Sequence, residues 1–558
     1  MAEAAGCRCA VAAESARITT GWVLPPKPIG GQDHVGVQAP CVALYTQLLP
    51  GITNVTDRAR YYSFHPWVLS HFDKRYPDQR TSIDAFARVI RRAECLLALI
   101  SIRHSRASVD EDPGRHDAAL VGRQELQKVD QPVIDLEDFA AFEGERRYFK
   151  NRLGGLGQYY YGPLRDLRVL GTTGEGRGTV PGYDATRGTV LAAALDEGVD
   201  ADLFFAVLEA PTVSTADLEA LAAFCPCHLA ENAREREGLR DLFLARSPLY
   251  GGDGGGRRRA TLGLVLELME RGCGRHPELG FEDAFRVVCY TGALPDGATW
   301  RSPPSLAAAH RGWATYQRNE LFSVAVQALF AAVLTAVVRD RGGGLGTSAD
   351  AGPIAAALCE GLGSELLAAP LPSVVERLAV ELPRLDEWRD ERHEIQQGWR
   401  CVSAFADQQP EALAVAAVRV LLALAARGLA EYPYADFELD PEYFDPRELH
   451  LLSFKQHLQG RWATMSVAEW ISWLAVRWGI ERHLRVALQK LRGQRQDTFR
   501  VRPLERSLQV VEAPAPAFTV PRIGTSLRIL RDIGLIDVVD SSYELTAAGK
   551  SALESIRG

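Results

Sequence analysis

The chain has 558 residues, of which 47% are hydrophobic and 24% are charged. This composition is typical of a globular protein and the length is enough for three or four domains. The formal net charge of −8 excludes a protein that coats nucleic acid over its whole surface, so any binding of a polyanion must be local.

The N-terminal residues 1–40 are rich in Gly and Pro and weakly patterned, so we expect a flexible lead-in. Residues 1–17 contain acids and no apolar core, which argues against a secretory signal peptide. The ten cysteines are scattered and we expect them to be reduced, as in a cytoplasmic protein.

A dense motif follows Pro50-Gly51, with arginines interleaved among aromatic residues. Its members are Arg58, Arg60, Tyr61, Tyr62, Phe64 and Trp67. Such a composition is typical of a surface that stacks bases and holds phosphate. It is equally typical of a helix whose aromatic residues are core and whose arginines form ion pairs, and we favour this structural interpretation while keeping Arg58 and Arg60 as possible phosphate ligands. A second helix is expected from Ser82 to Ile102.

Acidic residues cluster between 135 and 145, followed by Lys150. Carboxylates around Mg²⁺ would suit a nuclease, but the spacing of Glu145 and Lys150 does not fit the acid-acid-Lys type. The Gly-rich segments lack the spacing of dinucleotide-binding and phosphate-binding loops. We therefore predict no catalytic residues and no cofactor, with a Mg²⁺-dependent nuclease as an alternative that uses the acids of 135–145 or 436–445.

A Gly-rich loop with three arginines, Arg257, Arg258 and Arg259, precedes a predicted helix from Thr261 to Glu270. The free N–H groups of a helix start and the arginine charges suit an anion. A second phosphate-binding site is therefore possible here, and a plain surface loop is the alternative.

The longest apolar run, Leu321 to Val338, lies within a helical pattern from Pro304 to Arg341. It is just long enough to span a bilayer. Its polar members Ser323, Gln327 and Thr335 favour a buried core helix, and we expect no membrane association.

Cys225-Pro226-Cys227-His228 is the one internal close pair of cysteines. Its spacing is not the CxxC of a zinc site, no second half follows in the sequence, and adjacent Cys227 and His228 cannot easily reach one tetrahedral metal. The sequence therefore predicts no metal site.

The C-terminal stretch opens at Ser466 and Glu469, which are spaced as a capping box before a Trp-rich helical run. Residues 482–535 contain eleven Lys/Arg against four Asp/Glu, a local charge of +7. A basic island on an acidic protein is the expected footprint of polyanion binding. The candidate nucleic-acid ligands are Arg485, Lys490, Arg492, Arg495, Arg500, Arg502, Arg522, Arg528 and Arg531.

The last forty residues read as a helix from Arg522 to Asp532, two short strands around an Asp540-Ser-Ser turn, and a helix from Ala547 to Ile556. This order is typical of the end of a winged helix, whose second helix enters the major groove. Because winged helices also bind proteins, a partner-binding assembly subunit is the alternative.

The first motif, with Pro50, Gly51, Thr56, Arg58-Ala-Arg-Tyr-Tyr62, Phe64 and Pro66-Trp67, resembles a segment of uncharacterised bacterial proteins. Those proteins are encoded in anti-phage defence clusters beside helicases and phospholipase-D-type nucleases. The resemblance implies an accessory subunit of a multi-protein defence system, with helicase or nuclease partners, and no catalytic residues.

We therefore expect a mainly α-helical, multi-domain, cytoplasmic protein with a C-terminal winged-helix (α+β) domain. The expected divisions are residues 1–40, 41–170, 171–465 and 466–558. The expected function is that of a non-catalytic accessory subunit that binds duplex DNA with low sequence specificity.

Overall fold

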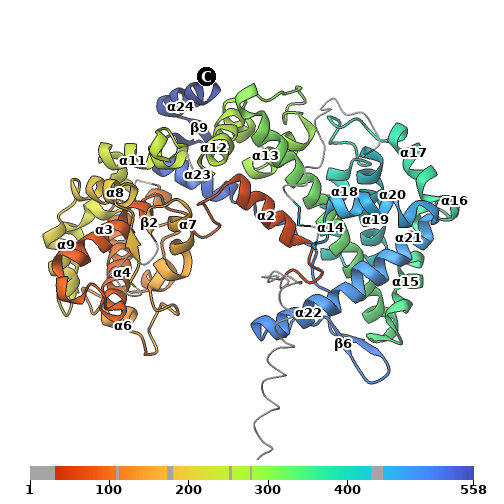
Figure 1. The fold of residues 1–558 in the computed structure, drawn as a ribbon, viewed down its shortest axis with the longest axis horizontal. Helices are drawn as coiled ribbons and strands as arrows, with labels where there is room; N and C mark the ends of the chain where they lie inside the picture. The colour runs from red at the N-terminus through yellow and green to blue at the C-terminus, as the bar shows by residue number, and fades with distance from the viewer. Residues whose placement is uncertain are drawn as a thin grey trace, which may run out of the picture. The chain divides into compact units, whose positions relative to one another are not determined.

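The computed structural model describes residues 32–108, 112–129, 131–171, 180–250, 254–276, 279–428, 444–445 and 447–558. The described chain is mainly helical, with four small sheets of two or three strands (Figure 1). Most of the expected lead-in and of the acidic segment 436–445 lie outside the described residues.

The chain forms two compact units. Unit 1 comprises residues 1–41, 319–383 and 389–518, and unit 2 comprises residues 42–318, 384–388 and 519–558. Neither unit is a continuous segment, and the expected C-terminal segment 466–558 is divided between them at residue 518.

Unit 2 contains the Arg/aromatic motif, which ends in helix α3 (Tyr61–Arg75). The aromatic side chains of Tyr61, Tyr62, Phe64 and Trp67 are fully buried, so they are core residues rather than a stacking surface. Unit 2 also contains α4 (Ile83–Ala107), α5 (Arg123–Leu126), α6 (Glu137–Ala140), α7 (Tyr161–Asp166), α8 (Arg187–Asp196), α9 (Ala201–Glu209), α10 (Thr215–Ala220), α11 (Ala233–Leu244), α12 (Gly255–Glu270) and α13 (Phe281–Thr291), of which α4, α8 and α11 pack against α3.

Two antiparallel strand pairs complete this part of unit 2. Strand β1 (Val133–Ile134) pairs with β4 (Val213–Ser214), and β2 (Leu170–Gly171) pairs with β3 (Gly182–Tyr183). In the chain between β1 and β2, a π-helical turn spans Leu156–Tyr160. The buried Glu94 of α4 accepts the N–H groups of Gly155 and Leu156 at 2.6 Å, which fixes this turn.

The C-terminal part of unit 2 has the expected order of helix, hairpin and helix. It consists of α23 (Ile523–Asp532), β8 (Ile536–Val539), β9 (Ser542–Leu545) and α24 (Ala547–Arg557). The hairpin turn places Asp540 and Ser541 at φ of 48° and 65°, the left-handed geometry of two-residue hairpin turns. The elements are confirmed, and their identity as a winged helix stays a prediction.

The long apolar pattern forms a single helix, α14 (Ala307–Arg341), whose residues up to Arg318 belong to unit 2 and from Asn319 to unit 1. With the preceding turn from Pro304 it is long and apolar enough to cross a membrane, but 83% of its most apolar window is buried within the protein. This burial agrees with the expected core helix.

Unit 1 contains the second part of α14, in which the Phe322 ring contacts those of Phe454 and Trp478. Its other helices are α15 (Ala351–Leu358), α16 (Ser364–Ala368), α17 (Leu371–Glu381), α18 (Glu394–Ala406), α19 (Pro410–Arg427), α20 (Leu451–Gln459), α21 (Val467–Trp473) and α22 (Glu481–Gln494). The unit also has a three-stranded antiparallel sheet, whose strands lie in the order β5 (Gly344–Leu345), β7 (Leu508–Val510) and β6 (Val501–Pro503).

The predicted capping box is confirmed at the start of α21. Ser466 Oγ accepts the N–H of Glu469, and the Glu469 carboxylate accepts the N–H of Ser466 at 2.8 Å. A π-helical turn at Leu474–Ile480 joins α21 to α22 as one helical segment. The buried rings of Trp462, Trp470 and Trp478 anchor this segment.

Candidate functional site

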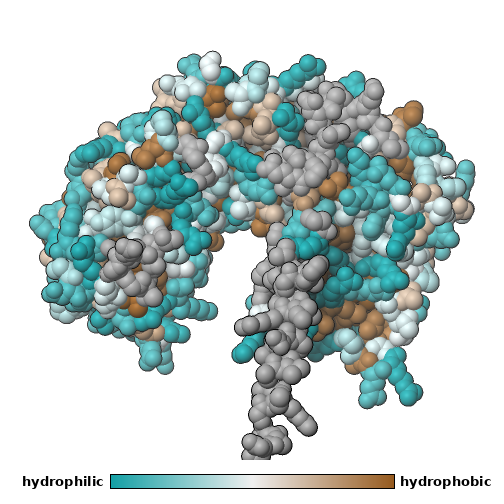
Figure 2. All heavy atoms as spheres, in the orientation of Figure 1, coloured by the Kyte–Doolittle hydropathy of each residue, from teal (hydrophilic) through white to brown (hydrophobic). Residues whose placement is uncertain are grey.

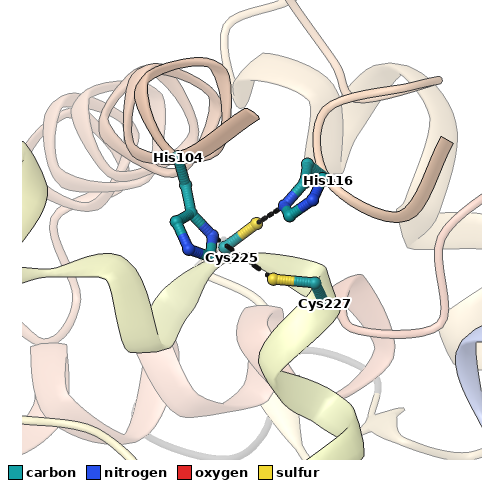
Figure 3. A group of neighbouring side chains, drawn as sticks. All are labelled: His104, His116, Cys225 and Cys227. Carbon is teal, nitrogen blue, oxygen red and sulfur yellow. Dashed lines mark hydrogen bonds between the residues drawn. The ribbon is translucent and has the colours of Figure 1, made fainter. Parts of the chain in front are cut away.

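Four metal-ligating side chains meet in unit 2 although the sequence predicted no metal site. His104, His116, Cys225 and Cys227 place one ligand atom each so that all four atoms lie within 4.8 Å of one another (Figure 3). Cys225 Sγ is 3.6 Å from His116 Nδ1, and Cys227 Sγ is 3.3 Å from His104 Nδ1. Within the described part of the chain, this is the group of His, Cys, Asp and Glu side chains spaced to hold a metal ion.

The four ligands come from three segments. His104 lies in the last turn of α4, and His116 follows the short helix η2 (Pro113–Arg115). Cys225 lies between η4 (Ala222–Phe224) and η5 (Pro226–Ala230), and Cys227 lies within η5. His116 and Cys225 are buried, while His104 and Cys227 are partly exposed.

The two arginines of the motif hold the ligand loops from behind. Arg58 donates to the carbonyl oxygens of Gly114, Arg115, His116 and Ala118 at 2.8–3.3 Å. Its guanidinium group also pairs with Asp532 of α23 at 3.0 Å. This one side chain therefore fixes the backbone of the His116 loop and ties it to the C-terminal helix.

Arg60 has the same role for the cysteine loop. It donates to the carbonyl oxygens of Ala223 at 2.6 Å and Cys225 at 2.8 Å, and it pairs with the fully buried Glu235 at 2.7 Å. Arg58 and Arg60 are each 1% exposed. Because both guanidinium groups are buried and donate to acceptors within the protein, the geometry favours the structural interpretation over phosphate binding.

Cys225 differs chemically from the other buried cysteines. Burial by itself would raise the pKa of its thiol, but hydrogen bonds with Cys227, His116 and His104 hold that pKa well below its usual range. Burial instead raises the pKa of Cys273 and Cys359 to about 12. The cluster thus favours the thiolate, the form that binds metal.

His228 also adjoins the cluster. Its ring stacks on that of His104 with the centroids 5.0 Å apart, and its Nδ1 lies 2.8 Å from the Glu231 carboxylate. The sequence argument that Cys227 and His228 cannot share one metal agrees with this arrangement. The sequence did not indicate this cluster of four side chains because the two histidines lie more than a hundred residues before the cysteines.

Of the acids between 135 and 145, Asp135, Asp138 and Glu145 line a cavity of about 630 Å³ in unit 2. Asp135 caps the N–H of Glu137 at 2.8 Å, and Asp138 pairs with Arg146 at 2.9 Å. Arg147 and Lys128 line the same cavity. Cations therefore face the acids, and the described acids of this region form no group spaced for a metal ion.

The nine predicted nucleic-acid ligands are divided between the units. Those from Arg485 to Arg502 lie in unit 1, and Arg522, Arg528 and Arg531 lie in unit 2. Within unit 2, Arg522 donates to the Ile52 carbonyl oxygen at 2.6 Å, and Arg531 pairs with Asp112 at 2.6 Å. Arg528 pairs with Asp57 at 3.0 Å, so all three are engaged within the protein.

The basic residues of α22 fall on two faces of that helix. Lys490 is buried and donates to the Asp33 carbonyl oxygen at 2.7 Å. Arg485, Arg492 and Arg495 are exposed and have no ion-pair partner among the described residues. Arg485 and Arg492 are seven residues apart, so they share one face of the helix, whereas Arg495 caps the C-terminal end of α22 with a left-handed φ of 55°.

The β6–β7 hairpin is anchored to α22 through His483. Its Nδ1 lies 3.0 Å from the His34 carbonyl oxygen, and its Nε2 accepts the N–H groups of Arg500 at 2.8 Å and Val501 at 3.2 Å. Arg500 pairs with Glu512, and the exposed Arg502 pairs with Asp497 at 2.9 Å. Figure 2 shows hydrophilic side chains at the free end of this hairpin and apolar surface beside them.

The arginines after the Gly-rich loop lie on α12 rather than on a loop. Arg258 is buried and donates to the carbonyl oxygens of Phe243 at 3.0 Å, Leu242 at 2.8 Å and Pro50 at 3.3 Å. Arg259 donates to the Ser555 carbonyl oxygen at 2.9 Å, and Arg257 is exposed. The three side chains therefore do not converge on one anion.

Comparison with known proteins found no matching family model, no matching curated protein and no matching solved structure.

Proposed function

We propose that this protein binds duplex DNA, with little sequence specificity, through the exposed arginine face of α22. The observation that carries the proposal is a set of three exposed arginines, Arg485 and Arg492 on one face of α22 and Arg495 at its C-cap, that meet no carboxylate among the described residues. An arginine held in an internal ion pair gains little from a phosphate, whereas an unpaired exposed one releases counterions from DNA when it binds.

The opposite face of α22 supports this role because it is firmly held. Arg482 donates to the Val35 carbonyl oxygen at 2.8 Å, and Lys490 and His483 contact the same segment. The helix therefore presents its arginines from a fixed position, so little conformational entropy is lost on binding. Arg506 on the anchored hairpin is exposed and extends the basic surface.

The resemblance of the Arg58–Trp67 motif to proteins of anti-phage clusters supports a place in a defence assembly. In this proposal the protein holds DNA for helicase or nuclease partners and performs no chemistry itself. Phosphate contacts fix position without reading bases, which suits a subunit that must engage any foreign DNA.

The test compares two charge-matched variants of the full-length chain. Arg492→Glu/Arg495→Glu changes the α22 face, and Arg400→Glu/Arg419→Glu changes two exposed arginines on α18 and α19 of the same unit. The affinity for a DNA duplex of about 20–30 base pairs, roughly two to three helical turns, is measured by fluorescence anisotropy over a range of salt concentrations. The α22 variant should bind more weakly to every sequence and lower the slope of log affinity against log salt by roughly two.

The two variants decide the proposal together. Equal losses would mean that general charge governs binding, and an unchanged α22 variant would remove the proposal. Point variants are needed because a deletion from Met465 onward would remove residues 465–518 from unit 1 and 519–558 from unit 2.

One observation favours a second function, the binding of a partner protein. Leu488 and Leu491 lie on or beside the arginine face and are 48% and 41% exposed, and Leu504 at the hairpin is 57% exposed. Apolar side chains beside arginines are typical of protein interfaces. Leu488→Ser/Leu491→Ser should then abolish a complex with the neighbouring gene products on co-expression while DNA affinity is kept.

A further inference from the structure

We propose that His104, His116, Cys225 and Cys227 bind one structural Zn²⁺ ion. The ligand atoms of a tetrahedral zinc site lie about 3.3–3.8 Å apart, given Zn–S bonds of about 2.3 Å and Zn–N bonds of about 2.0 Å. The two measured pairs, Cys227 Sγ–His104 Nδ1 at 3.3 Å and Cys225 Sγ–His116 Nδ1 at 3.6 Å, fall in this range. The remaining pairs, at most 4.8 Å apart, need only a small contraction.

The donor set selects the metal. Two thiolates and two imidazoles suit Zn²⁺, whereas Mg²⁺ and Ca²⁺ prefer oxygen ligands. All four positions are filled by protein groups, and catalytic zinc sites keep one position for water or substrate. The site is therefore structural.

The site joins three segments of unit 2. His104 is at the end of α4, His116 is in the loop after η2, and the cysteines flank Pro226. Arg58 and Arg60 pre-position the two loops through their carbonyl oxygens, so the ligands converge before metal arrives. Pre-positioned ligands bind metal more tightly because less backbone freedom is lost.

The zinc site also supports the C-terminal helix–hairpin–helix within unit 2. The His116 loop carries Asp112, which pairs with Arg531 at 2.6 Å, and Arg115, which pairs with Asp537 at 2.5 Å. The same loop is tied to Asp532 through Arg58. Loss of the ion should therefore loosen both this loop and α23.

The first test measures metal in the full-length protein, purified without added zinc, by inductively coupled plasma mass spectrometry. We expect about one Zn²⁺ per chain, because a closed four-ligand site binds a single ion. After the zinc is removed by a chelator, the addition of one equivalent of Co²⁺ should produce a d–d absorption of tetrahedral intensity together with a thiolate-to-cobalt charge-transfer band. No stoichiometric metal and no such spectrum on titration with Co²⁺ would overturn the proposal.

Variants then identify the ligands. His104→Ala should lose the metal, whereas His228→Ala should keep it, although the two rings stack 5.0 Å apart. Cys225→Ala/Cys227→Ala should lose it, whereas Cys273→Ala/Cys289→Ala, two buried cysteines of the same unit, should keep it. Metal loss in His228→Ala with retention in His104→Ala would overturn the ligand assignment.

The wild-type protein keeps the proposal testable if a ligand variant does not fold. Hydrogen exchange is compared in the zinc-bound and chelated wild type. Faster exchange confined to residues 112–120, 222–230 and 523–532 is expected. Unchanged exchange in all three segments, with metal removed, would show that the ion does not support this structure.

Discussion

The guanidinium group of Arg60 donates a hydrogen bond to the carbonyl oxygen of Cys225, 2.8 Å away, from within the fully buried core of unit 2. Arg58, two residues earlier, donates in the same way to the carbonyl oxygen of His116 at 3.2 Å. One tripeptide thus holds both loops of the candidate metal centre. Each arginine also neutralises a buried carboxylate, Glu235 for Arg60 and Asp532 for Arg58.

Arg60→Lys should destabilise the protein and weaken metal binding. A lysine keeps the charge but cannot serve Glu235 and two carbonyl oxygens at once, because it lacks the planar fork of arginine. We expect a loss of about 3 kcal/mol in the free energy of unfolding and roughly a tenfold to hundredfold weaker zinc affinity. Urea denaturation and competition with a zinc chelator measure the two effects.

The control is Arg75→Lys at the other end of α3. Arg75 pairs with Asp202, whose side chain is 94% exposed. Surface pairs contribute little, so this variant should change stability by less than about 1 kcal/mol and leave zinc affinity unchanged. Similar effects of the two substitutions would contradict the role assigned to Arg60.

The sequence predicts much of the local structure, because helix caps and tight turns depend on residues that are close together in the chain. The helix after Ser82, the capping box at Ser466 and the hairpin turn at Asp540 all appear where expected. Each depends on contacts over a few residues: a side chain capping its own helix, or a turn whose backbone favours positive φ.

The metal-ligand cluster could not be predicted in this way. Cys225 and His116 lie in loops more than a hundred residues apart, each held by one arginine of the motif, and the sequence of neither loop indicates the other. The Cys-Pro-Cys spacing was the available signal. Similarly, the composition of the Arg/aromatic motif fits a surface or a core, and only the packing around Tyr61 and Trp67 decides for the core.

The basic segment 482–535 shows that a count of charges along the sequence does not identify which arginines are available to a ligand. Arg522 and Arg485 contribute equally to a count along the sequence. In the structure Arg522 stacks over the Tyr45 ring, 4.9 Å from its centroid, while Arg485 is exposed. Charge density along a chain therefore indicates where polyanion binding is possible and does not identify which cations remain available for it.

Asp532→Asn should loosen the C-terminal helix α23. The Asp532 carboxylate accepts two hydrogen bonds from Arg58 at 3.0 Å and one from the N–H of Ala59 at 2.9 Å. Asparagine leaves the buried Arg58 without a counter-charge, at a cost of roughly 3–5 kcal/mol. Hydrogen exchange should become faster in α23 and in residues 112–118.

Asp537→Asn is the matched comparison for this prediction. Its ion pair with Arg115 has side chains that are 37% and 45% exposed, so less than about 1 kcal/mol is expected. If Asp537→Asn cost as much as Asp532→Asn, burial of the Arg58 pair would not explain the effect.

His483 should make the stability of unit 1 depend on pH. Burial, with the nearby Arg500 and Lys490, lowers the pKa of His483 from 6.5 to about 4, although the His34 carbonyl oxygen acts in the other direction. The adjoining His34 is shifted in the same way. In the folded state His483 is therefore neutral where the unfolded chain would already be protonated.

The sign follows from proton uptake. Between pH 6.5 and about 4 the unfolded state binds more protons than the folded state. The free energy of unfolding therefore falls as the pH is lowered through this window, and the contribution of His483 is fully present above it. The shift corresponds to up to about 3 kcal/mol. In His483→Gln the stability should be lower at pH 7 and vary less between pH 7 and 4, as measured by urea denaturation at each pH; an unchanged pH dependence would contradict this assignment.

Gly549→Ala should destabilise the C-terminal helix–hairpin–helix, while Gly256→Ala should not. A Cβ atom at Gly549 of α24 would lie 2.0 Å from the carbonyl oxygen of Leu535, so the helix must move away from the strand β8 that follows that residue. Overpacking of this kind costs typically about 1–3 kcal/mol. At Gly256 of α12 nothing lies within 4 Å of the new atom, and alanine favours the helix by up to about 1 kcal/mol. Denaturant midpoints that shift in opposite directions for the two variants would show that Gly549 is required for close packing; equal shifts would refute the packing argument.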